Sequence, residues 1–474
     1  MKLSQLLTQI GKPQAISADP EILGVALDSR LVQKGFIFVA TQGIPLAGRA
    51  PLNGHDFIPK ALENGAVAVV GSEDLHLNVP YLRTDNPREF CALLASEVLG
   101  RPQDRLHIVG ITGSKGKSTT VALLFHLLEF AGIAVAQMST VAVRYLGREE
   151  HLPGHFTTPE SPQVYELLSR FADAGCTHVV MEVSSHALDL ERVTGIEFAV
   201  GAFINFYPDD HIDFHGSQAA YFAAKAKLLH KSRFAVLLDS IAAQYGQHPK
   251  LERILPLTGV QAQADGLHFL WDDQPYFVPM IGEFNAINAA AALAIGRHLG
   301  IAREQLRQGL ASFTGVPGRM QLIQAKPFRV INDFAHTGKS LEQAAQTLRQ
   351  TTAGRLIVLI GAAGQRDPNR RTGIGSVAAQ VADYTIFTEE DSRTESTQAI
   401  LGQLEAAFLA SGGGLYQLIP DRREAIHFAI GLAQEGDTVL LCGKGHERTL
   451  ERGTEFLPWD ETAEALEALR QMAL

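Results

Sequence analysis

Short apolar runs alternate with amphipathic stretches along most of the chain. The runs last five to nine residues and are bounded by turn-forming residues, which is typical of strands, whereas the stretches between them repeat their apolar residues at helical spacing. Such alternation predicts an α/β fold in which parallel sheets are covered by helices on both faces. The expected strands are 35–43, 66–72, 106–112, 177–183, 200–206, 328–335, 355–362, 383–389 and 437–445, and the clearest expected helices are 87–100 and 118–132.

The pattern separates three segments, which we expect to be three domains. Residues 1–101 mix short strands with turns and are predicted to form an N-terminal α/β domain. Residues 102–318 begin with an apolar strand and a glycine-rich turn, and they end in the turn-rich segment 315–319. Residues 319–474 repeat the alternation and are predicted to form a Rossmann-like domain. A chain of 474 residues accommodates three domains of about 150 residues each.

Composition and charge exclude several classes of protein. Hydrophobic residues make up 46% of the chain and charged residues 19%, as in ordinary globular proteins. The formal net charge is −10, which argues against a nucleic-acid or membrane-surface binder. The sequence also lacks the basic track that a motor or DNA-acting ATPase would need. An acidic protein can still bind phosphate through backbone amides and a few cations.

The cysteines and the apolar segments indicate a cytoplasmic protein. The three cysteines, Cys91, Cys176 and Cys442, form no CxxC pair, so we expect neither a disulfide framework nor a structural zinc site. The first residues contain too short an apolar stretch for a signal peptide. The sequence contains no run of about 18 apolar residues, so we expect no membrane span.

The strongest local signal is the sequence TGSKGKSTT at 112–120, between an expected strand and an expected helix. Glycines let the backbone approach a phosphate, and the amides at the start of the helix face it. Lys117 can reach the β- and γ-phosphates, and the Ser118 hydroxyl can ligate Mg²⁺. Ile111 stands where the common phosphate-loop motif has its first glycine, so a glycine-rich turn with no ligand is the alternative.

This loop resembles the variant found in the Mur ligase family, and further motifs of that family follow in the family's order. They are LDSR (27–30), TTP (157–159), EVSSHAL (182–188), DHIDFHG (210–216), YFAAKAKLL (221–229), FNAINAAAA (284–292), PGRM (317–320), DFAHT (333–337), GAAGQRD (361–367) and GKGHE (443–447). EVSSHAL, YFAAK and GKGHE resemble the MurE branch. That branch adds a diamino acid to UDP-N-acetylmuramoyl-L-Ala-D-Glu during peptidoglycan precursor biosynthesis.

The resemblance implies a role for each domain and a set of ATP-binding residues. The first domain would bind the UDP-muramoyl substrate, the central one ATP, and the last one the amino acid. A carboxylate such as Asp333 suits ribose hydroxyls, and a guanidinium such as Arg319 suits phosphate oxygens. The implied ATP-binding residues are Gly113, Ser114, Lys115, Gly116, Lys117, Ser118, Thr119, Asn288, Arg319, Asp333 and His336.

The resemblance also implies a Mg²⁺ site that Ser118, Glu182, His211 and Lys225 form. Glu182 ends an expected strand, where open α/β sheets bind ligands, and its carboxylate suits Mg²⁺ better than the His211 imidazole does. In the family the lysine at the position of Lys225 carries CO₂ as a carbamate, so we expect Lys225 to be N6-carboxylated. The residues alone leave an alternative for each position. Glu182 would be a solvated strand end, His211 a hydrogen-bonded core histidine and Lys225 an exposed lysine on a helix.

For the muramoyl substrate the resemblance implies six residues in the first two segments: Leu27, Ser29, Thr157, Thr158, Ser184 and Arg192. Arg192 suits a carboxylate or phosphate. Turn capping is the alternative role of Ser29 and the two threonines, and a surface ion pair that of Arg192. Leu190 stands where some relatives have Gln, and the segment 41–49 is atypical, so no uracil contact is assigned.

For the amino acid the resemblance implies Arg371, Glu390, Asp391, Ser392, Arg393, Gly443 and Glu447. Relatives that use meso-diaminopimelate carry DNPR before the last strands. The DNPR at 85–88 lies before the phosphate loop, and we interpret it as a coincidental turn. Its counterpart is EDSR at 390–393. Arg393 can pair with a distal carboxylate, which favours diaminopimelate, whereas Glu390 and Asp391 favour a side-chain ammonium, as in L-lysine or L-ornithine. Neutralisation of these two acids is the alternative role of Arg393, and of the three amino acids we expect diaminopimelate.

The implied reaction is that of an ATP-dependent carboxylate–amine ligase that forms an acyl phosphate, ADP and phosphate, and we expect a monomer. One alternative is a Mur-ligase-like paralogue that joins an amino acid to a different carboxylate. Another is a nucleotide-binding homologue without catalysis. The presence of Lys117, Ser118, Glu182, His211 and Lys225 favours an active ligase.

Overall fold

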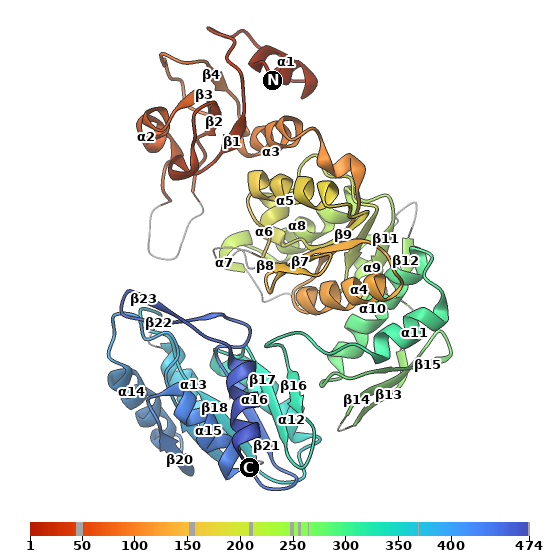
Figure 1. Ribbon diagram of the computed structural model, residues 1–474, viewed down its shortest axis with the longest axis vertical. Helices are drawn as coiled ribbons and strands as arrows, with labels where there is room; N and C mark the ends of the chain where they lie inside the picture. The colour runs from red at the N-terminus through yellow and green to blue at the C-terminus, as the bar shows by residue number, and fades with distance from the viewer. Residues whose placement is uncertain are drawn as a thin grey trace. The chain divides into compact units, whose positions relative to one another are not determined.

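The computed structural model describes residues 1–43, 51–150, 157–207, 212–246, 251–254, 257–263, 265–367 and 369–472 (Figure 1). The chain divides into two compact units. The first comprises Met1–Leu255 and Ala291–Leu306, and the second comprises Pro256–Ala290 and Arg307–Leu474. Each unit is described by itself.

The first unit begins with a four-stranded parallel sheet in the order β1-β2-β3-β4. Alternate residues of the strands face opposite sides, so Ile37 and Val39 pack with α1 and α3, while Phe38 packs with α2. The elements are α1 (Leu3–Gln9), β1 (Gly24–Ala26), β2 (Phe36–Val39), α2 (Ile58–Glu63), β3 (Ala66–Gly71), β4 (Tyr81–Arg83) and α3 (Pro87–Val98), with short 3-10 turns at Ser29–Leu31, Gly54–Phe57 and Pro102–Arg105.

An eight-stranded sheet follows, in the order β12-β11-β10-β5-β9-β6-β7-β8. Its first six strands are parallel, and the hairpin β7–β8 adds two antiparallel strands at one edge. The strands are β5 (His107–Thr112), β6 (Val135–Met138), β7 (Val143–Tyr145), β8 (Arg148–Glu150), β9 (His178–Glu182), β10 (Val200–Phe203), β11 (Ala235–Leu237) and β12 (Leu251–Arg253). The helices are α4 (Lys117–Phe130), α5 (Ser161–Asp173), α6 (Ser185–Asp189), α7 (Ile212–His215), α8 (Gln218–His230) and α9 (Asp239–Tyr245).

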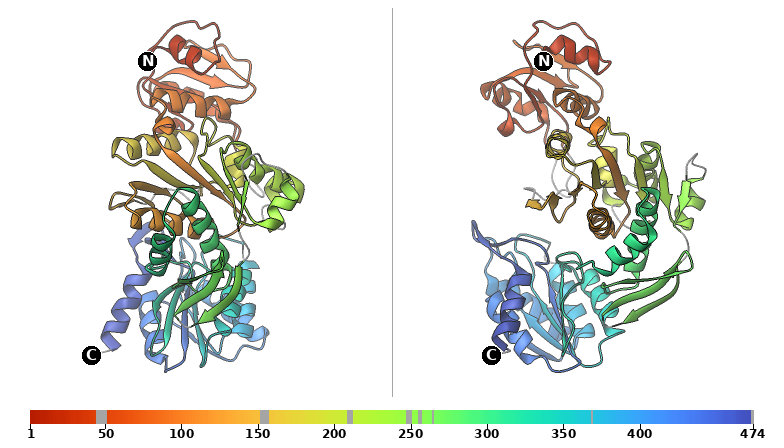
Figure 2. Two further views of the ribbon diagram at one scale, coloured as in Figure 1. Left: turned by 90° about the vertical axis from the view of Figure 1, so that its right-hand side faces the viewer. Right: turned by 45° about the vertical axis from the view of Figure 1, so that its right-hand side comes forward.

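Three antiparallel strands and two helices connect this region to the last sheet. The strands β13 (Leu257–Gln263), β14 (Gly266–Trp271) and β15 (Gln274–Val278) lie side by side in both views of Figure 2. The helices are α10 (Phe284–His298) and α11 (Arg303–Ala311). The buried face of the strands carries Phe269, Trp271 and Tyr276.

The second unit contains a six-stranded sheet in the order β16-β17-β21-β18-β19-β20, parallel except for β16. Leu356, Val358 and Ile360 face α12, α13 and α14, whereas Ile357 and Leu359 face α15 and α16, so helices cover both sides. The strands are β16 (Gln321–Gln324), β17 (Arg329–Asp333), β18 (Leu356–Ile360), β19 (Tyr384–Phe387), β20 (Leu415–Leu418), β21 (Thr438–Cys442) and the outlying hairpin β22 (Thr449–Arg452) and β23 (Glu455–Pro458). The helices are α12 (Gly338–Arg349), α13 (Asn369–Val381), α14 (Thr397–Ala410), α15 (Arg422–Leu432) and α16 (Glu461–Met472).

The α/β fold class is confirmed, and every strand and helix expected above is present within a few residues. The antiparallel strands β7, β8 and β13–β15 were not expected, because they are short or carry many polar residues. The division at residues 101 and 318 stays a prediction. Among the described residues, no helix combines the length and apolar character that crossing a membrane requires.

Candidate functional site

The loop between β5 and α4 has the backbone of a phosphate-binding loop. Gly116 has φ +79°, in the left-handed region that favours glycine, and it directly precedes the first turn of α4. A Cβ at Gly113 would lie 2.7 Å from Ile204 Cγ1, so only glycine fits there. Lys117 Nζ donates to the carbonyls of Gly113 (3.0 Å) and Ser114 (3.1 Å), which holds its ammonium over the loop.

Residues that follow β10 hold the loop in place. The Asn205 side chain accepts from Lys115 N (3.0 Å) and donates to Lys115 O (2.8 Å). Ser114 Oγ accepts from Tyr207 N (2.9 Å) and lies 3.0 Å from the Tyr221 hydroxyl. The loop is therefore preorganised by the segment that follows β10 and by Tyr221 of α8, so binding an anion requires little reordering.

Lys225 of α8 contacts this loop and is buried, whereas the helical pattern alone suggested an exposed lysine. Its side chain is 1% exposed, and Nζ donates to Gly113 O at 2.7 Å, the same carbonyl that Lys117 contacts. Nζ also lies 4.7 Å from the centre of the Tyr221 ring. The neighbouring Lys227 is 43% exposed and pairs with Asp189 (2.6 Å).

Glu182 lies at the same edge of the sheet as the loop. It ends β9, opposite Ile111 of β5, and it is buried. Its Oε1 accepts from Thr140 N at 2.8 Å. His211 lies outside the described residues, and within the described ranges no group of three or more His, Cys, Asp or Glu side chains could hold a metal ion.

The donor types at this edge nevertheless fit Mg²⁺. The Glu182 carboxylate and the half-buried Ser118 hydroxyl are hard oxygen donors. A carbamate on Lys225 would add two more oxygens, and its remaining N–H could keep the hydrogen bond to Gly113 O. Lys225, Ser118 and Glu182 therefore suit an ion that prefers oxygen.

Three of the six predicted muramoyl-binding residues, Thr158, Ser184 and Arg192, are linked in one cluster beside Glu182. Thr158 Oγ1 donates to Glu182 O (3.0 Å) and accepts from Ser184 N (3.1 Å). Arg192 is 2% exposed and donates to Thr158 O (2.9 Å) and Glu160 Oε1 (2.7 Å). The Arg192 side chain is therefore buried and its partner Glu160 is partly exposed, which corrects the surface pairing that we considered. Burial lowers the pKa of the Arg192 guanidinium.

The Ser184 side chain also caps a helix, and Thr157, Leu27 and Ser29 complete the predicted group. Ser184 Oγ caps α6 by accepting from Ala187 N (3.1 Å), and Thr157 lies at the start of the described segment that follows residue 156. In the N-terminal sheet region, Leu27 packs against the core and Ser29 is buried. Asp28, not Ser29, caps the 3-10 turn there.

The DNPR sequence at 85–88 starts α3 rather than forming a turn. Asn86 Oδ1 accepts from Glu89 N (3.2 Å) and caps the helix, and Pro87 is its first residue. Arg88 NH1 pairs with Glu160 Oε2 at 3.1 Å, so Glu160 is shared between Arg88 and Arg192. Arg88 therefore has a structural role in pairing with Glu160, and nothing links it to the predicted amino-acid site.

In the second unit, Asp333, Arg319 and His336 surround the loop that follows β17. Asp333 accepts from Met320 N (2.7 Å) and Ala335 N (2.9 Å), and burial raises the pKa of its carboxyl. The Arg319 guanidinium lies 5.0 Å from the Phe334 ring, and His336 Nδ1 bonds to Phe334 O at 2.8 Å. Burial lowers the pKa of His336.

Asn288 is buried in α10, where its Nδ2 donates to Asn285 Oδ1 at 2.8 Å. The phosphate loop and the Asp333 group belong to different units, so each is a site component in its own unit.

The predicted amino-acid residues gather where β18, β19 and β21 end. Lys444 is fully buried and donates to Asp391 Oδ1 (2.8 Å) and Glu447 Oε2 (2.6 Å). Burial works against the charge of Lys444, but the carboxylates of Glu447 and Asp391 outweigh it and raise the pKa of the ammonium. The cluster therefore contains two carboxyl groups, those of Asp391 and Glu447, around the single ammonium of Lys444.

Glu390 adds a further carboxyl to this cluster. It is buried, and its Oε2 lies 2.8 Å from the position that a Cβ on Gly443 would occupy. This oxygen is buried without a hydrogen-bond partner among the described residues. Burial raises the pKa of Glu390 to about 7, with Arg422 and Lys444 acting in the opposite direction.

The two predicted arginines and Ser392 are engaged elsewhere at this edge. Arg393 Nε donates to Glu451 Oε2 (2.8 Å) and its NH1 to Gly364 O (3.1 Å). Arg371 bonds to Gln403 (2.9 Å) and pairs with Glu395 (2.9 Å). Ser392 is buried, and its carbonyl lies where a Cβ on Gly364 would clash. Arg393 therefore neutralises Glu451, and not Glu390 or Asp391.

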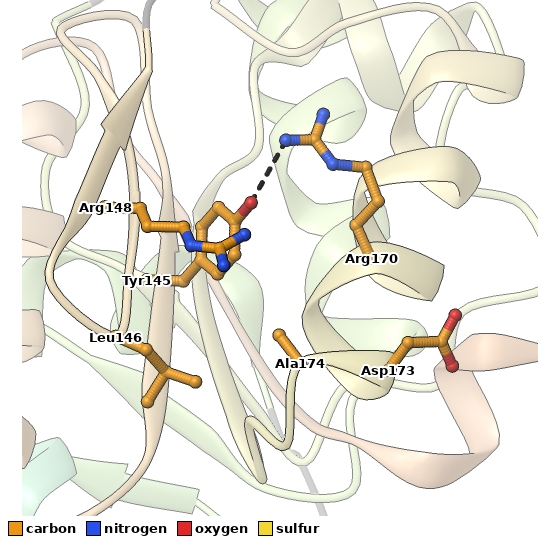
Figure 3. Close-up of a pocket in the computed structure, with 6 residues that line it drawn as sticks. All are labelled: Tyr145, Leu146, Arg148, Arg170, Asp173 and Ala174. Atoms are coloured by element: carbon orange, nitrogen blue, oxygen red, sulfur yellow. Dashed lines mark hydrogen bonds between the residues drawn. The ribbon is translucent and has the colours of Figure 1, made fainter.

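A cavity of about 420 Å³ lies elsewhere in the first unit, between the β7–β8 hairpin and the end of α5 (Figure 3). It is lined by Tyr145, Leu146, Arg148, Arg170, Asp173 and Ala174. Arg148 and Arg170 lie over the Tyr145 ring at 5.7 and 5.9 Å, and Arg170 also pairs with Glu150 (2.5 Å). None of the predicted site residues lines this cavity.

Sequence reasoning missed Asn205, Glu160, Lys444 and Arg422 as residues of these sites. Asn205 follows an apolar strand at the sheet edge, as Glu182 does, so the same positional signal could have identified it. Lys444 lies inside the GKGHE motif. Nothing in the sequence distinguishes Arg422 from the adjacent Arg423.

These features define a class of protein: an α/β protein with a phosphate loop of the nucleotide-binding type and a separate Rossmann-like sheet. The Mur ligase middle domain matches residues 111–296, and the Mur ligase, glutamate ligase domain matches residues 318–445. The chain belongs to the Mur ligase family and is an ATP-dependent amide-bond-forming ligase.

Similar proteins span its whole length. The chain is 43% identical to the UDP-N-acetylmuramyl-tripeptide synthetase of Deinococcus radiodurans, over 99% of this chain and 100% of that protein. It is 34% identical to the UDP-N-acetylmuramoyl-L-alanyl-D-glutamate–2,6-diaminopimelate ligase of Geobacillus thermodenitrificans, again over 99% and 100%. A solved structure of a ligase with the latter name matches all of both chains with a TM-score of 0.68 and 27% identity.

Proposed function

We propose that the protein joins a diamino acid to the D-glutamate side-chain carboxylate of UDP-N-acetylmuramoyl-L-Ala-D-Glu, with conversion of ATP to ADP and phosphate. The observation that carries this proposal is the phosphate loop with Lys117 and Lys225 on one carbonyl, beside the buried Thr158–Ser184–Arg192 cluster. The names of full-length relatives support the UDP-linked acceptor substrate.

The reaction proceeds in two steps, phosphorylation of the carboxylate and attack by the amine. A carboxylate oxygen attacks the γ-phosphorus of ATP, the bond to the β-phosphate oxygen breaks, and ADP leaves. The neutral amine of the amino acid then attacks the acyl carbon, phosphate leaves, and the nitrogen loses a proton. Lys117 and the loop amides stabilise the charge on the transferred phosphoryl group, because phosphoryl transfer depends mainly on positioning and electrostatics.

We further propose that Ser118, Glu182, His211 and Lys225 hold Mg²⁺, with Lys225 carboxylated on Nζ. Bound Mg²⁺ would supply positive charge that lets the ATP phosphates and the substrate carboxylate approach. The buried position of Lys225 supports carboxylation, because a carbamate replaces a desolvated cation by an anion that a metal ion can balance.

Carboxylation is testable without turnover. Protein equilibrated with ¹³C-bicarbonate and Mg²⁺ should show a carbamate carbon resonance that Lys225→Arg abolishes. Lys227→Arg, two residues away on the same helix, is the matched control and should keep the signal. A resonance that survives Lys225→Arg would place the carbamate on another amine.

The contacts of Arg393 bear on which diamino acid is added. Its guanidinium is paired with Glu451, whereas Glu390 presents an unpartnered carboxyl oxygen toward Gly443. We therefore propose an amino acid whose distal end carries an ammonium group alone, such as L-lysine or L-ornithine, in place of the meso-diaminopimelate that Arg393 suggested. Relatives named as 2,6-diaminopimelate ligases stand against this choice.

A panel of amino acids distinguishes the candidates. The initial rate of ADP formation is measured with ATP, Mg²⁺, the UDP-linked dipeptide, and meso-diaminopimelate, L-lysine or L-ornithine in turn. We expect one of the two monocarboxylic acids to give the highest kcat/KM. A preference for diaminopimelate would show that Arg393 leaves Glu451 to bind the distal carboxylate.

A further inference from the structure

A fully buried ion pair lies behind the predicted amino-acid site. Arg422, the first residue of α15, is 0% exposed and forms two hydrogen bonds with Glu461 of α16, Nε to Oε2 (2.9 Å) and NH2 to Oε1 (2.6 Å). Glu461 Oε2 also accepts from Trp459 Nε1 at 2.8 Å. Replacing such a pair by apolar side chains is often neutral for stability, so stability alone does not explain charges at this place.

The remaining donors of Arg422 reach two strand ends. NH1 donates to Glu389 O (2.9 Å) and NH2 to Cys442 O (2.7 Å). These carbonyls directly precede Glu390 and Gly443. The strands that lead to them, β19 and β21, are not neighbours, because β18 lies between them. No strand-to-strand hydrogen bond therefore sets the distance between the two segments, and the guanidinium spans it.

We propose that Arg422 is a positioning residue for the incoming amino acid. By holding the carbonyls of Glu389 and Cys442, it fixes the position of the Glu390 carboxyl relative to Gly443, the two residues proposed to contact the distal ammonium group of the substrate. The planar guanidinium suits this role because its donors are fixed relative to one another, whereas a lysine ammonium is a single point on a flexible stem. The inference rests on the proposed function of Glu390 and Gly443.

The test compares two ion pairs between the same helices. The double variant Arg422→Met/Glu461→Met removes both buried charges and leaves neither unpaired. The control Arg423→Met/Glu464→Met removes the adjacent pair, in which Arg423 is 64% exposed. KM and kcat are measured for the amino acid, ATP and the UDP-linked dipeptide, and far-UV circular dichroism and thermal midpoints report the fold.

We expect the Arg422/Glu461 variant to raise the KM for the amino acid by about 10- to 100-fold, the size of the effect known for groups that orient metal ligands. The KM values for ATP and the dipeptide should stay within about twofold of the parent. The Arg423/Glu464 control should match the parent in all three. Arg422→Lys, which keeps the charge but cannot span both carbonyls, should show an intermediate KM.

Three results would overturn the inference. An unchanged KM for the amino acid in the double variant shows that the two carbonyls need no support. An equal loss for all three substrates, or unfolding of both the double variant and Arg422→Lys, shows that the pair is structural. Glu390→Gln separates these results from a failure of the proposed site: if it leaves the KM for the amino acid unchanged, the site lies elsewhere.

Discussion

Three cationic side chains, Lys117, Lys225 and Arg422, each donate to backbone carbonyls at the two sheet edges. Lys117 was identifiable because the loop motif fixes both its position and its chemistry. Lys225 was identifiable only through the family resemblance, because its helix also carries Lys227 and local spacing does not tell which lysine is buried. Arg422 could not be found, because its burial depends on the packing of α15 and α16 against the sheet.

Removing the Lys117 ammonium should stop the reaction without unfolding the protein. The Lys117 side chain is half-buried and donates to loop carbonyls. Lys117→Ala therefore removes positive charge from the phosphate site and only a small part of the packing around it. We expect ADP formation to fall by about 10²-fold or more. Lys60→Ala, which removes an exposed lysine paired with Glu63, serves as the control and should retain the parent rate. Normal turnover in Lys117→Ala would refute the assignment of the loop.

The carboxyl of Glu390 should make stability depend on pH in an unusual direction. Its pKa is raised from 4.5 to about 7 by burial, so between these values the folded protein binds more protons than the unfolded chain. Stability therefore falls as pH rises through this window, by up to about 1.4 kcal/mol per pH unit. Glu390→Gln removes this term, so the thermal midpoint of the parent should fall relative to that of the variant between about pH 5 and pH 7.

The control for this titration is Glu467→Gln, which removes a half-exposed carboxyl of α16. Its midpoint should run parallel to that of the parent over the same pH range. Parallel curves for Glu390→Gln as well would mean that the Glu390 carboxyl is ionised in the folded protein throughout.

Whole elements were predicted well where apolar periodicity is strong. The parallel strands of both large sheets are nearly continuous runs of Val, Ile and Leu, because helices bury them on both faces. The hairpin β7–β8 was missed because Arg148, Glu149 and Glu150 give no alternation. The packing of one helix on another was also beyond the sequence, as two glycines of α13 illustrate.

Gly373 and Gly375 lie in the same helix but face different surroundings. A Cβ at Gly373 meets nothing within 4 Å, whereas one at Gly375 would lie 2.4 Å from Leu404 O and 2.9 Å from Ala407 Cβ of α14. Gly373→Ala should therefore stabilise the protein by about 0.5–1 kcal/mol through helix propensity. Gly375→Ala should destabilise it by about 1–3 kcal/mol, because α13 and α14 must separate. Thermal unfolding of the two variants beside the parent measures both effects, and equal midpoints would show that α14 does not pack on α13 through Gly375.

At the scale of the whole molecule, the predicted ATP-binding residues are divided between the two units. Lys117 and its loop belong to the first, and Arg319, Asp333 and His336 belong to the second. The sequence could assign these residues through family motifs but not through any local pattern, because residues so far apart in the chain share no periodicity.

The most direct test of this account is the dependence of ADP release on the two acceptor substrates. Purified protein is given ATP and Mg²⁺ with the UDP-linked dipeptide, with the diamino acid, with both, or with neither, and ADP is measured over time. We expect sustained ADP release, with one tripeptide product formed per ADP, only when the UDP-linked dipeptide and the diamino acid are both present. ADP release at the same rate without the dipeptide, or none with any of the three diamino acids, would contradict it.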